Sequence, residues 1–98
     1  MLSPTGFTRA KRALQAALRD GSYQHEARSG IDTKNLLATG AVSAEAILDV
    51  VKRCNESHCK SSPHYSVPGV TVHVLQRDGW YSKFYFVDPV TTFISVHQ

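Results

Sequence analysis

The amino-acid sequence predicts an α+β fold in which N-terminal helices pack on a small antiparallel sheet. In the first half of the 98-residue chain, apolar residues recur at helical spacing. After Pro68 the pattern changes to alternating apolar and polar residues, which is typical of strands. A chain of this length has room for one modest core, so residues 1–98 are expected to form a single domain.

The first helix is predicted over residues 8–19, because Leu14, Leu18 and their neighbours share one side and Gly21 can end the helix. Its polar side is basic, since four cationic residues precede the first acidic residue of the chain: Arg9, Lys11, Arg12 and Arg19. This asymmetry suggests an acidic partner, which nucleic acid or an acidic protein surface would both satisfy. A solvated helix face is the alternative interpretation.

Two further helices are predicted before the strands begin. A short one starts at Asp32 as N-cap and stops at Gly40. The stronger signal follows Ser43, which can cap a helix whose C-terminal end is basic. Its apolar stripe consists of Ile47, Val50, Val51 and Cys54.

Three strands are predicted over residues 70–76, 80–87 and 91–97, with the turns "RDG" and "DPV" between them. Successive side chains of a strand point to opposite faces, so the residues can be sorted into two sets. The core set, expected beneath the helix that carries Ile47, is led by Val72, Phe84 and Ile94. The opposite face would then gather His73, Tyr81, Lys83, Tyr85, Ser95 and His97. Exposed strand formers without a function are the alternative for each of them.

Composition narrows the functional classes. The formal net charge is +3, and no apolar run approaches the roughly 20 residues that cross a bilayer, so we expect no membrane association. The N-terminus lacks the pattern of a secretory signal, and Cys54 and Cys59 fit free thiols in a reducing compartment. These observations predict a cytoplasmic protein.

The segment between the last predicted helix and the first predicted strand contains side chains that could bind a metal ion. Cys54, His58, Cys59 and His64 lie close together in sequence, but their spacing does not match the usual pairs of zinc ligands. We therefore expect Cys54 to be a core residue and Cys59 to lie at a strand edge. His25 and Arg28 form a further pair that could contact RNA or merely flank a loop.

The order of elements and three local motifs resemble the MqsR family of toxins, within the RelE-like and BrnT-like superfamily of toxin-antitoxin ribonucleases. The motifs are "HCKSSPHYS", "GWYSKFYF" and "FISVHQ", and the resemblance spans most of the chain. Carried over by position, Lys60 and Tyr81 match functional residues of the family. His73 stands about where the family has a glutamine, and His97 where it has its last lysine, so the identity of the acid and the base cannot be copied.

The resemblance implies a RelE-like or barnase-like fold and metal-independent cleavage of messenger RNA without a cofactor, with a cognate antitoxin as protein partner. In such a reaction a base removes the proton of the ribose 2′-OH, an acid protonates the leaving oxygen, and cations hold the phosphorane charge. We assign the acid-base pair to His97 and His73. Lys60 and Tyr81 complete the predicted catalytic set, as phosphate stabiliser and as stacking or proton-relay group. RNA contacts are expected from Lys83, His64, Tyr85 and Arg77.

Two other functional classes stay open at this point. A noncatalytic RNA- or protein-binding module could use the same basic and aromatic face, since Tyr and Lys on a sheet also describe a base-stacking platform. The histidine pair is the feature that favours the enzyme. The antitoxin side of such a module is disfavoured by the positive charge of the chain. A homodimer is compatible with the sequence.

Overall fold

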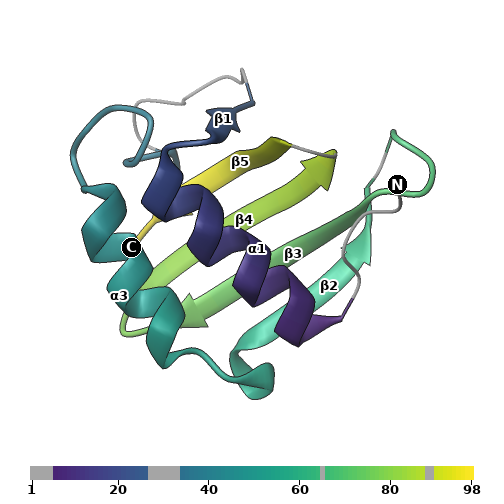
Figure 1. Ribbon diagram of the computed structural model, residues 1–98, viewed down its shortest axis with the longest axis horizontal. Helices are drawn as coiled ribbons and strands as arrows, with labels where there is room; N and C mark the ends of the chain where they lie inside the picture. The colour runs from purple at the N-terminus through teal and green to yellow at the C-terminus, as the bar shows by residue number, and fades with distance from the viewer. Residues whose placement is uncertain (1–5, 27–33, 65, 88–89) are drawn as a thin grey trace.

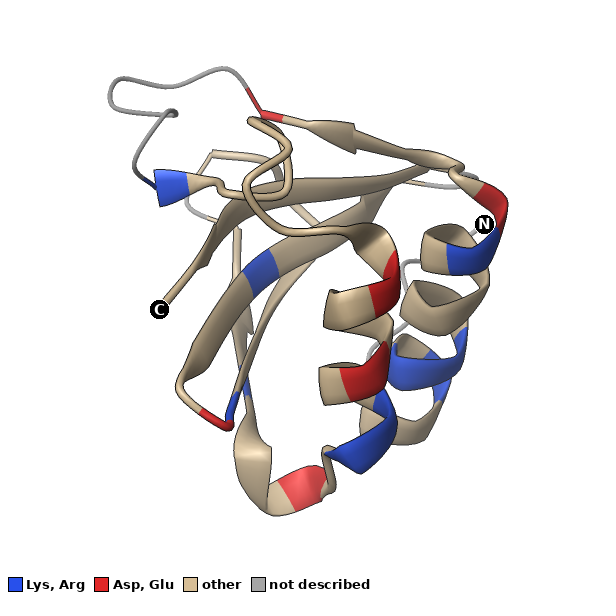
Figure 2. Ribbon diagram, turned by 90° about the vertical axis from the view of Figure 1, so that its left-hand side faces the viewer, with Lys and Arg blue, Asp and Glu red and all other residues tan. Residues whose placement is uncertain are grey.

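Two helices lie across one face of a five-stranded sheet in the part of the chain that the computed structural model describes, residues 6–26, 34–64, 66–87 and 90–98 (Figure 1). The helices are α1 (Phe7–Asp20) and α3 (Ala44–Arg53), and a short 3-10 helix, η1 (Glu56–His58), follows them. The strands are β1 (Tyr23–His25), β2 (Cys59–Pro63), β3 (Thr71–Arg77), β4 (Trp80–Val87) and β5 (Val90–His97). Seen from the side, sheet and helices form two layers (Figure 2). The α+β class is confirmed.

The sheet is mixed, which corrects the prediction of a purely antiparallel one. Its strand order is β1-β5-β4-β3-β2, and the pairs from β2 to β5 are antiparallel as expected. At the other edge, β1 pairs with β5 in parallel, with His25 opposite Phe93. A parallel neighbour requires a crossover between the strands, and here the rest of the chain supplies it. The strands β1 and β2 were both missed because each is short and has no clear alternation.

Helix α1 confirms the first predicted helix. Ala10, Leu14, Ala17 and Leu18 are buried on one side, as their spacing requires. Gly21 ends the helix with φ 71°, a left-handed conformation that suits glycine at this position. The ammonium of Lys11 donates hydrogen bonds to the carbonyls of Lys52 and Cys54, at 3.1 and 2.8 Å, and so ties α1 to the C-terminal end of α3.

Helix α3 also forms as predicted. The hydroxyl oxygen of Ser43 accepts a hydrogen bond from the Ala46 N–H at 3.1 Å, which satisfies one of the unpaired donors of the first turn. Ile47, Val50 and Val51 are buried against the sheet, and Cys54 is buried just beyond the last turn. The prediction that Cys54 is a core residue is confirmed.

The helix predicted from Asp32 to Gly40 is wrong over residues 35–40, and Asp32 itself lies outside the described residues. Asn35 instead forms a bridge to Val96, and the Leu36 N–H donates to the Val96 carbonyl at 2.7 Å. The side-chain oxygen of Asn35 accepts from the Ala38 N–H at 3.0 Å. An asparagine that bonds the backbone in this way favours a turn over a helix.

The turn between β3 and β4 decides which side chains face the helices. Asp78 and Gly79 both have positive φ, 56° and 81°, which is the conformation of a two-residue hairpin loop. Arg77 therefore pairs with Trp80, and His73 pairs with Phe84. His73 and Phe84 were predicted on opposite faces, but a register difference of one residue moves every side chain of a strand to the other face. His73 and Leu75 thus face the helices, whereas Val72 and Val74 face away from them.

A bulge changes the alternation of β5 as well. Lys83 pairs with Ser95 and Phe84 pairs with Phe93, so Ile94 is left as an extra residue. As a result Phe93 enters the core and is fully buried, whereas strict alternation with Ile94 in the core would place Phe93 on the opposite face. Ile94 and Val72 are buried but lie outside the core cluster, so their predicted place beneath α3 is wrong.

The core lies between the two layers. It joins Leu14 of α1 and Ile47 of α3 to Phe84, Phe93 and Val96 of the sheet. Phe84 is therefore buried on the helix side of the sheet, as predicted. None of the described helices is long and apolar enough to span a membrane.

Candidate functional site

The sheet face turned away from the helices carries most of the predicted site residues. We call it the outer sheet face and define it by residues that the strand register places on one side: Lys60, Val74, Gln76, Tyr81, Lys83, Tyr85, Ser95 and His97. Two rows of directly opposed residues cross this face. One row is Gln76, Tyr81 and His97, and the other is Lys60, Val74, Lys83 and Ser95.

The first row brings an imidazole onto a phenol. The rings of Tyr81 and His97 are stacked, with centroids 4.8 Å apart and planes at 17°. His97 Nδ1 lies 3.2 Å from the carbonyl oxygen of Gln98. A carbonyl can only accept, so Nδ1 carries the proton and Nε2 of the neutral ring has the lone pair. The row thus offers a base, a hydroxyl and, in Gln76, an exposed amide.

The second row adds positive charge beside the first. Lys83 follows Tyr81 by two residues on β4, so their side chains leave the strand about 7 Å apart. Lys60 on the edge strand β2 lies in the same row as Lys83, two strands or about 10 Å away. Lysine side chains of this length can converge on one anion between them. The predicted grouping of Lys60, Tyr81, Lys83 and His97 on one face therefore agrees with the strand register.

Tyr85 and His64 lie at the other end of the outer sheet face. The Tyr85 hydroxyl donates to a carboxylate oxygen of Glu26 at 2.9 Å, and its ring meets the His64 ring edge-on at 4.9 Å. His64 is only 9% exposed, and its Nδ1 accepts from the backbone N–H groups of Ser66 and Val67, each at 3.1 Å. His64 therefore supports the loop after β2 and has little surface for a ligand.

His73 is not part of this face, which corrects its assignment to the acid-base pair. Its side chain is fully buried on the helix side, with its ring stacked 5.6 Å from that of Phe84. Nδ1 lies 3.0 Å from the Ser61 hydroxyl. An imidazole in this position cannot reach the proton of an RNA molecule that binds the outer sheet face, because the sheet stands between them. The predicted histidine pair does not exist as a pair.

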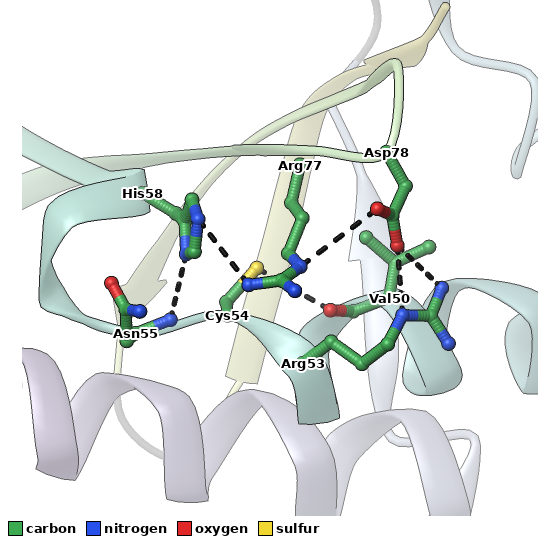
Figure 3. Close-up of polar contacts among 7 residues, drawn as sticks. All are labelled: Val50, Arg53, Cys54, Asn55, His58, Arg77 and Asp78. Carbon is green, nitrogen blue, oxygen red and sulfur yellow. Dashed lines mark hydrogen bonds and ion pairs between the residues drawn. The ribbon is translucent and has the colours of Figure 1, made fainter.

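Arg77 is also on the helix side, so it does not join Lys83 and Tyr85 on the outer sheet face, although it was predicted to contact RNA with them. Figure 3 shows its guanidinium at the end of the sheet, between His58 and Asp78. Nη1 lies 3.3 Å from His58 Nε2, and Nε lies 3.8 Å from an Asp78 oxygen. The same carboxylate accepts a hydrogen bond of 2.7 Å from Arg53. This cluster joins the β3–β4 turn to the end of α3. Within it, the positive charge of Arg77 is paired with the carboxylate of Asp78.

The sequence did not decide whether His25 contacts RNA or only flanks a loop, and in the fold its ring makes contacts within the protein. Its ring stacks on Phe93 with centroids 5.9 Å apart, and Nδ1 lies 3.0 Å from the side-chain nitrogen of the fully buried Asn35. The amide nitrogen can only donate, so His25 Nδ1 accepts and is unprotonated. Burial lowers the pKa of His25 below its usual value of 6.5. Arg28 lies outside the described residues.

The two cysteines are free thiols, as predicted. Cys54 is buried, and Cys59 lies on the edge strand β2, where it packs against the core. Burial is the largest influence on both thiols and raises the pKa of each above its usual value of 9.0. A raised pKa keeps a thiol neutral and weakly nucleophilic. Within the residues that the structure describes, no three His, Cys, Asp or Glu side chains group as metal ligands.

Two residues at the outer sheet face were not predicted from the sequence: Gln76, which lies on it, and Glu26, which contacts Tyr85 from beside it. Gln76 lies opposite Tyr81 on the neighbouring strand and was given no role in the predicted site. The dipeptide Asp78-Gly79 was a signal for this register, because it specifies a two-residue loop. Glu26 meets Tyr85 only through the pairing of β1 with β5, for which the sequence holds no local signal.

Comparisons of this chain with known protein families, with curated proteins and with solved structures gave no match. The resemblance to the MqsR family therefore stays a prediction from the three motifs.

Proposed function

We propose that the outer sheet face binds single-stranded RNA and cleaves it at the end formed by Tyr81 and His97. The observation that carries the proposal is the position of these two stacked rings beside Lys83, with Lys60 in the same row as Lys83. Aromatic rings next to cations suit unpaired nucleotides, because bases stack on the rings and phosphates bind the ammonium groups.

The proposed reaction needs no group outside the chain and the RNA. His97 Nε2 accepts the proton of the ribose 2′-OH, and the 2′-oxygen forms a bond to the adjacent phosphorus. The bond from phosphorus to the 5′-oxygen breaks, the Tyr81 hydroxyl gives its proton to that oxygen, and a 2′,3′-cyclic phosphate remains. Solvent then returns a proton from His97 to Tyr81. Lys60 and Lys83 stabilise the charge on the phosphorane, and Gln76 is placed to hold a phosphate or base edge.

The biological role that fits this chemistry is the toxin of a type II toxin-antitoxin system, as the family resemblance implies. Messenger RNA is the proposed substrate and a cognate antitoxin the proposed protein partner. Expression of the wild-type chain should then stop growth and fragment RNA, and the chain with Tyr81→Phe should do neither.

A noncatalytic RNA-binding module is the second candidate. The burial of His73 favours it, because the second imidazole that distinguished an enzyme from a stacking platform is absent from the outer sheet face. The two candidates share their binding residues and differ only in what the hydroxyl of Tyr81 and the imidazole of His97 do.

Tyr81→Phe separates the candidates, because it removes the hydroxyl and keeps the ring. With a labelled single-stranded RNA, we expect cleavage to fall at least about tenfold while the Kd changes less than about twofold. Tyr85→Phe is the matched control, since it removes the same atom from the same strand and face. Equal cleavage by the wild type and Tyr81→Phe would overturn the role of the hydroxyl. If the wild type binds the RNA and leaves it intact, the noncatalytic candidate takes over.

A further inference from the structure

The outer surface of α1 carries a row of arginines without internal partners. Arg9, Arg12 and Arg19 are exposed, and in the described part of the chain none of them has a carboxylate within 4.0 Å. Lys11, the fourth basic residue of the helix, differs because it caps the end of α3. Figure 2 shows the Lys and Arg positions along α1, in the layer on the far side of the sheet from the outer sheet face. Glu56 shares a shallow hollow with Arg9 at one end of the row.

The spacing of this row is that of a helix-packing seam. With Ala16, which is also exposed, the residues follow one another at intervals of three, four and three: Arg9, Arg12, Ala16 and Arg19. This is the spacing by which one helix faces another along its length. The row extends over about 15 Å of the helix axis, which is three turns. Ala16 has the smallest side chain of the row, so a second helix could approach closely between the arginines.

We propose that this surface of α1, the arginine row, is a docking site for an acidic helical segment of a partner protein. Guanidinium groups bind carboxylates through two parallel hydrogen bonds, and three of them on one seam complement a helix with carboxylates at the same spacing. A phosphate chain would also be attracted to the charge, but neither the seam spacing nor the small residue at Ala16 would matter to it. The proposal does not depend on the RNA cleavage proposed above.

The location of the row has a consequence for such a partner. The arginine row and the outer sheet face lie on opposite sides of the molecule, separated by the sheet (Figure 2). A partner helix that binds α1 leaves Tyr81, Lys83 and His97 uncovered. The two surfaces can therefore be tested independently, and a partner can be held at one while RNA is bound at the other.

Binding of two synthetic peptides, followed by fluorescence anisotropy, tests the proposal. One peptide is an alanine-rich helix with glutamates in a 3-4-3 seam around a central alanine, and the other has the same composition with its glutamates spread around the helix. We expect the seam peptide to bind the wild-type protein at least about tenfold more tightly, because only it can face all three arginines at once.

Three variants sharpen the result. Arg12→Glu with Arg19→Glu should weaken binding of the seam peptide at least about tenfold and leave the Kd for single-stranded RNA unchanged. Lys60→Glu with Lys83→Glu changes the net charge equally and should do the reverse. Ala16→Gln, a neutral change on an exposed helix position, should weaken the seam peptide about threefold or more if a helix packs on Ala16. Circular dichroism verifies that each variant keeps its helices.

The same measurements distinguish an acidic helix from other molecules that could bind the arginine row. Equal affinity for both peptides together with an unaffected Ala16→Gln variant would mean unspecific charge attraction and would overturn the proposal. Loss of RNA binding in the α1 variant, with peptide binding intact, would assign the row to RNA. A wild-type dimer in light scattering that becomes monomeric in the α1 variant would make a second copy of this chain the occupant, in place of another protein.

Discussion

The two faces of the sheet use histidine in opposite ways. On the helix side, His73 is fully buried, stacks on Phe84 and contacts the Ser61 hydroxyl, so its ring is part of the core. On the outer side, His97 stacks on Tyr81 at the rim, with Nε2 available as a base. The sequence shows two histidines in strands of similar composition. The strand register, more than the residue type, therefore decides which imidazole can contact a substrate.

The largest expected effect that tests this comparison is on RNA cleavage. His97→Gln removes the proposed base and keeps a polar side chain at a position that buries no apolar surface in the core. We expect the cleavage rate to fall about 10²- to 10⁴-fold with a free energy of unfolding within about 0.5 kcal/mol of the wild type. Single-turnover cleavage and urea denaturation measure the two quantities. Wild-type cleavage by this variant would remove His97 from the mechanism.

A change of similar size, but in stability, is expected for the buried histidine. His73→Ala removes a ring packed against Phe84 and leaves a cavity in the core, which should lower the free energy of unfolding by about 2–4 kcal/mol. Urea denaturation at constant pH gives this value. His97→Ala is the matched control and should cost less than about 1 kcal/mol. If His73→Ala is as stable as the wild type and still loses cleavage, His73 belongs to the site after all.

The smallest expected effect concerns a third histidine, at the edge where β1 meets β5. Burial lowers the pKa of His25 in the folded state, so the unfolded chain binds a proton more readily. The free energy of unfolding should therefore decrease as the pH falls from above 6.5 to the lower folded-state pKa. Protonation of Nδ1 would also remove the acceptor of the hydrogen bond that the Asn35 amide donates. His25→Gln should reduce this pH dependence. Urea denaturation between pH 7.5 and pH 5 compares the slopes, and identical slopes would contradict the assignment.

Much of the fold followed from local signals in the sequence. The two main helices were predictable because Ser43 and Gly21 mark ends and the apolar stripes are regular. The register of β3 and β4 was available too, since Asp78-Gly79 specifies a two-residue loop, but a three-residue reading of the turn put His73 on the wrong face. The outer positions of Tyr81, Lys83 and His97 did not depend on that error.

The remaining features depend on contacts between distant segments. The bulge at Ile94 lies in β5, which pairs with β4 on one side and with β1 on the other, and no local sequence signal predicts it. The helix predicted from Asp32 to Gly40 does not form over residues 35–40, because Asn35 pairs with Val96 and its side chain holds a turn. Glu26 reached Tyr85 only through the parallel strand β1. Such tertiary pairings override local propensity, which is why these parts of the site were missed.

The exposed edge of the sheet gives Lys60 a second role. Strand β2 ends the sheet, and an uncovered edge can pair with another chain and start aggregation. A charged side chain at Lys60 and a residue without an N–H at Pro63 are features that discourage such pairing. Replacing Lys60 with valine would therefore remove a proposed phosphate contact and also favour edge-to-edge association. Lys60→Gln, which stays polar, is the substitution that can separate solubility from RNA binding.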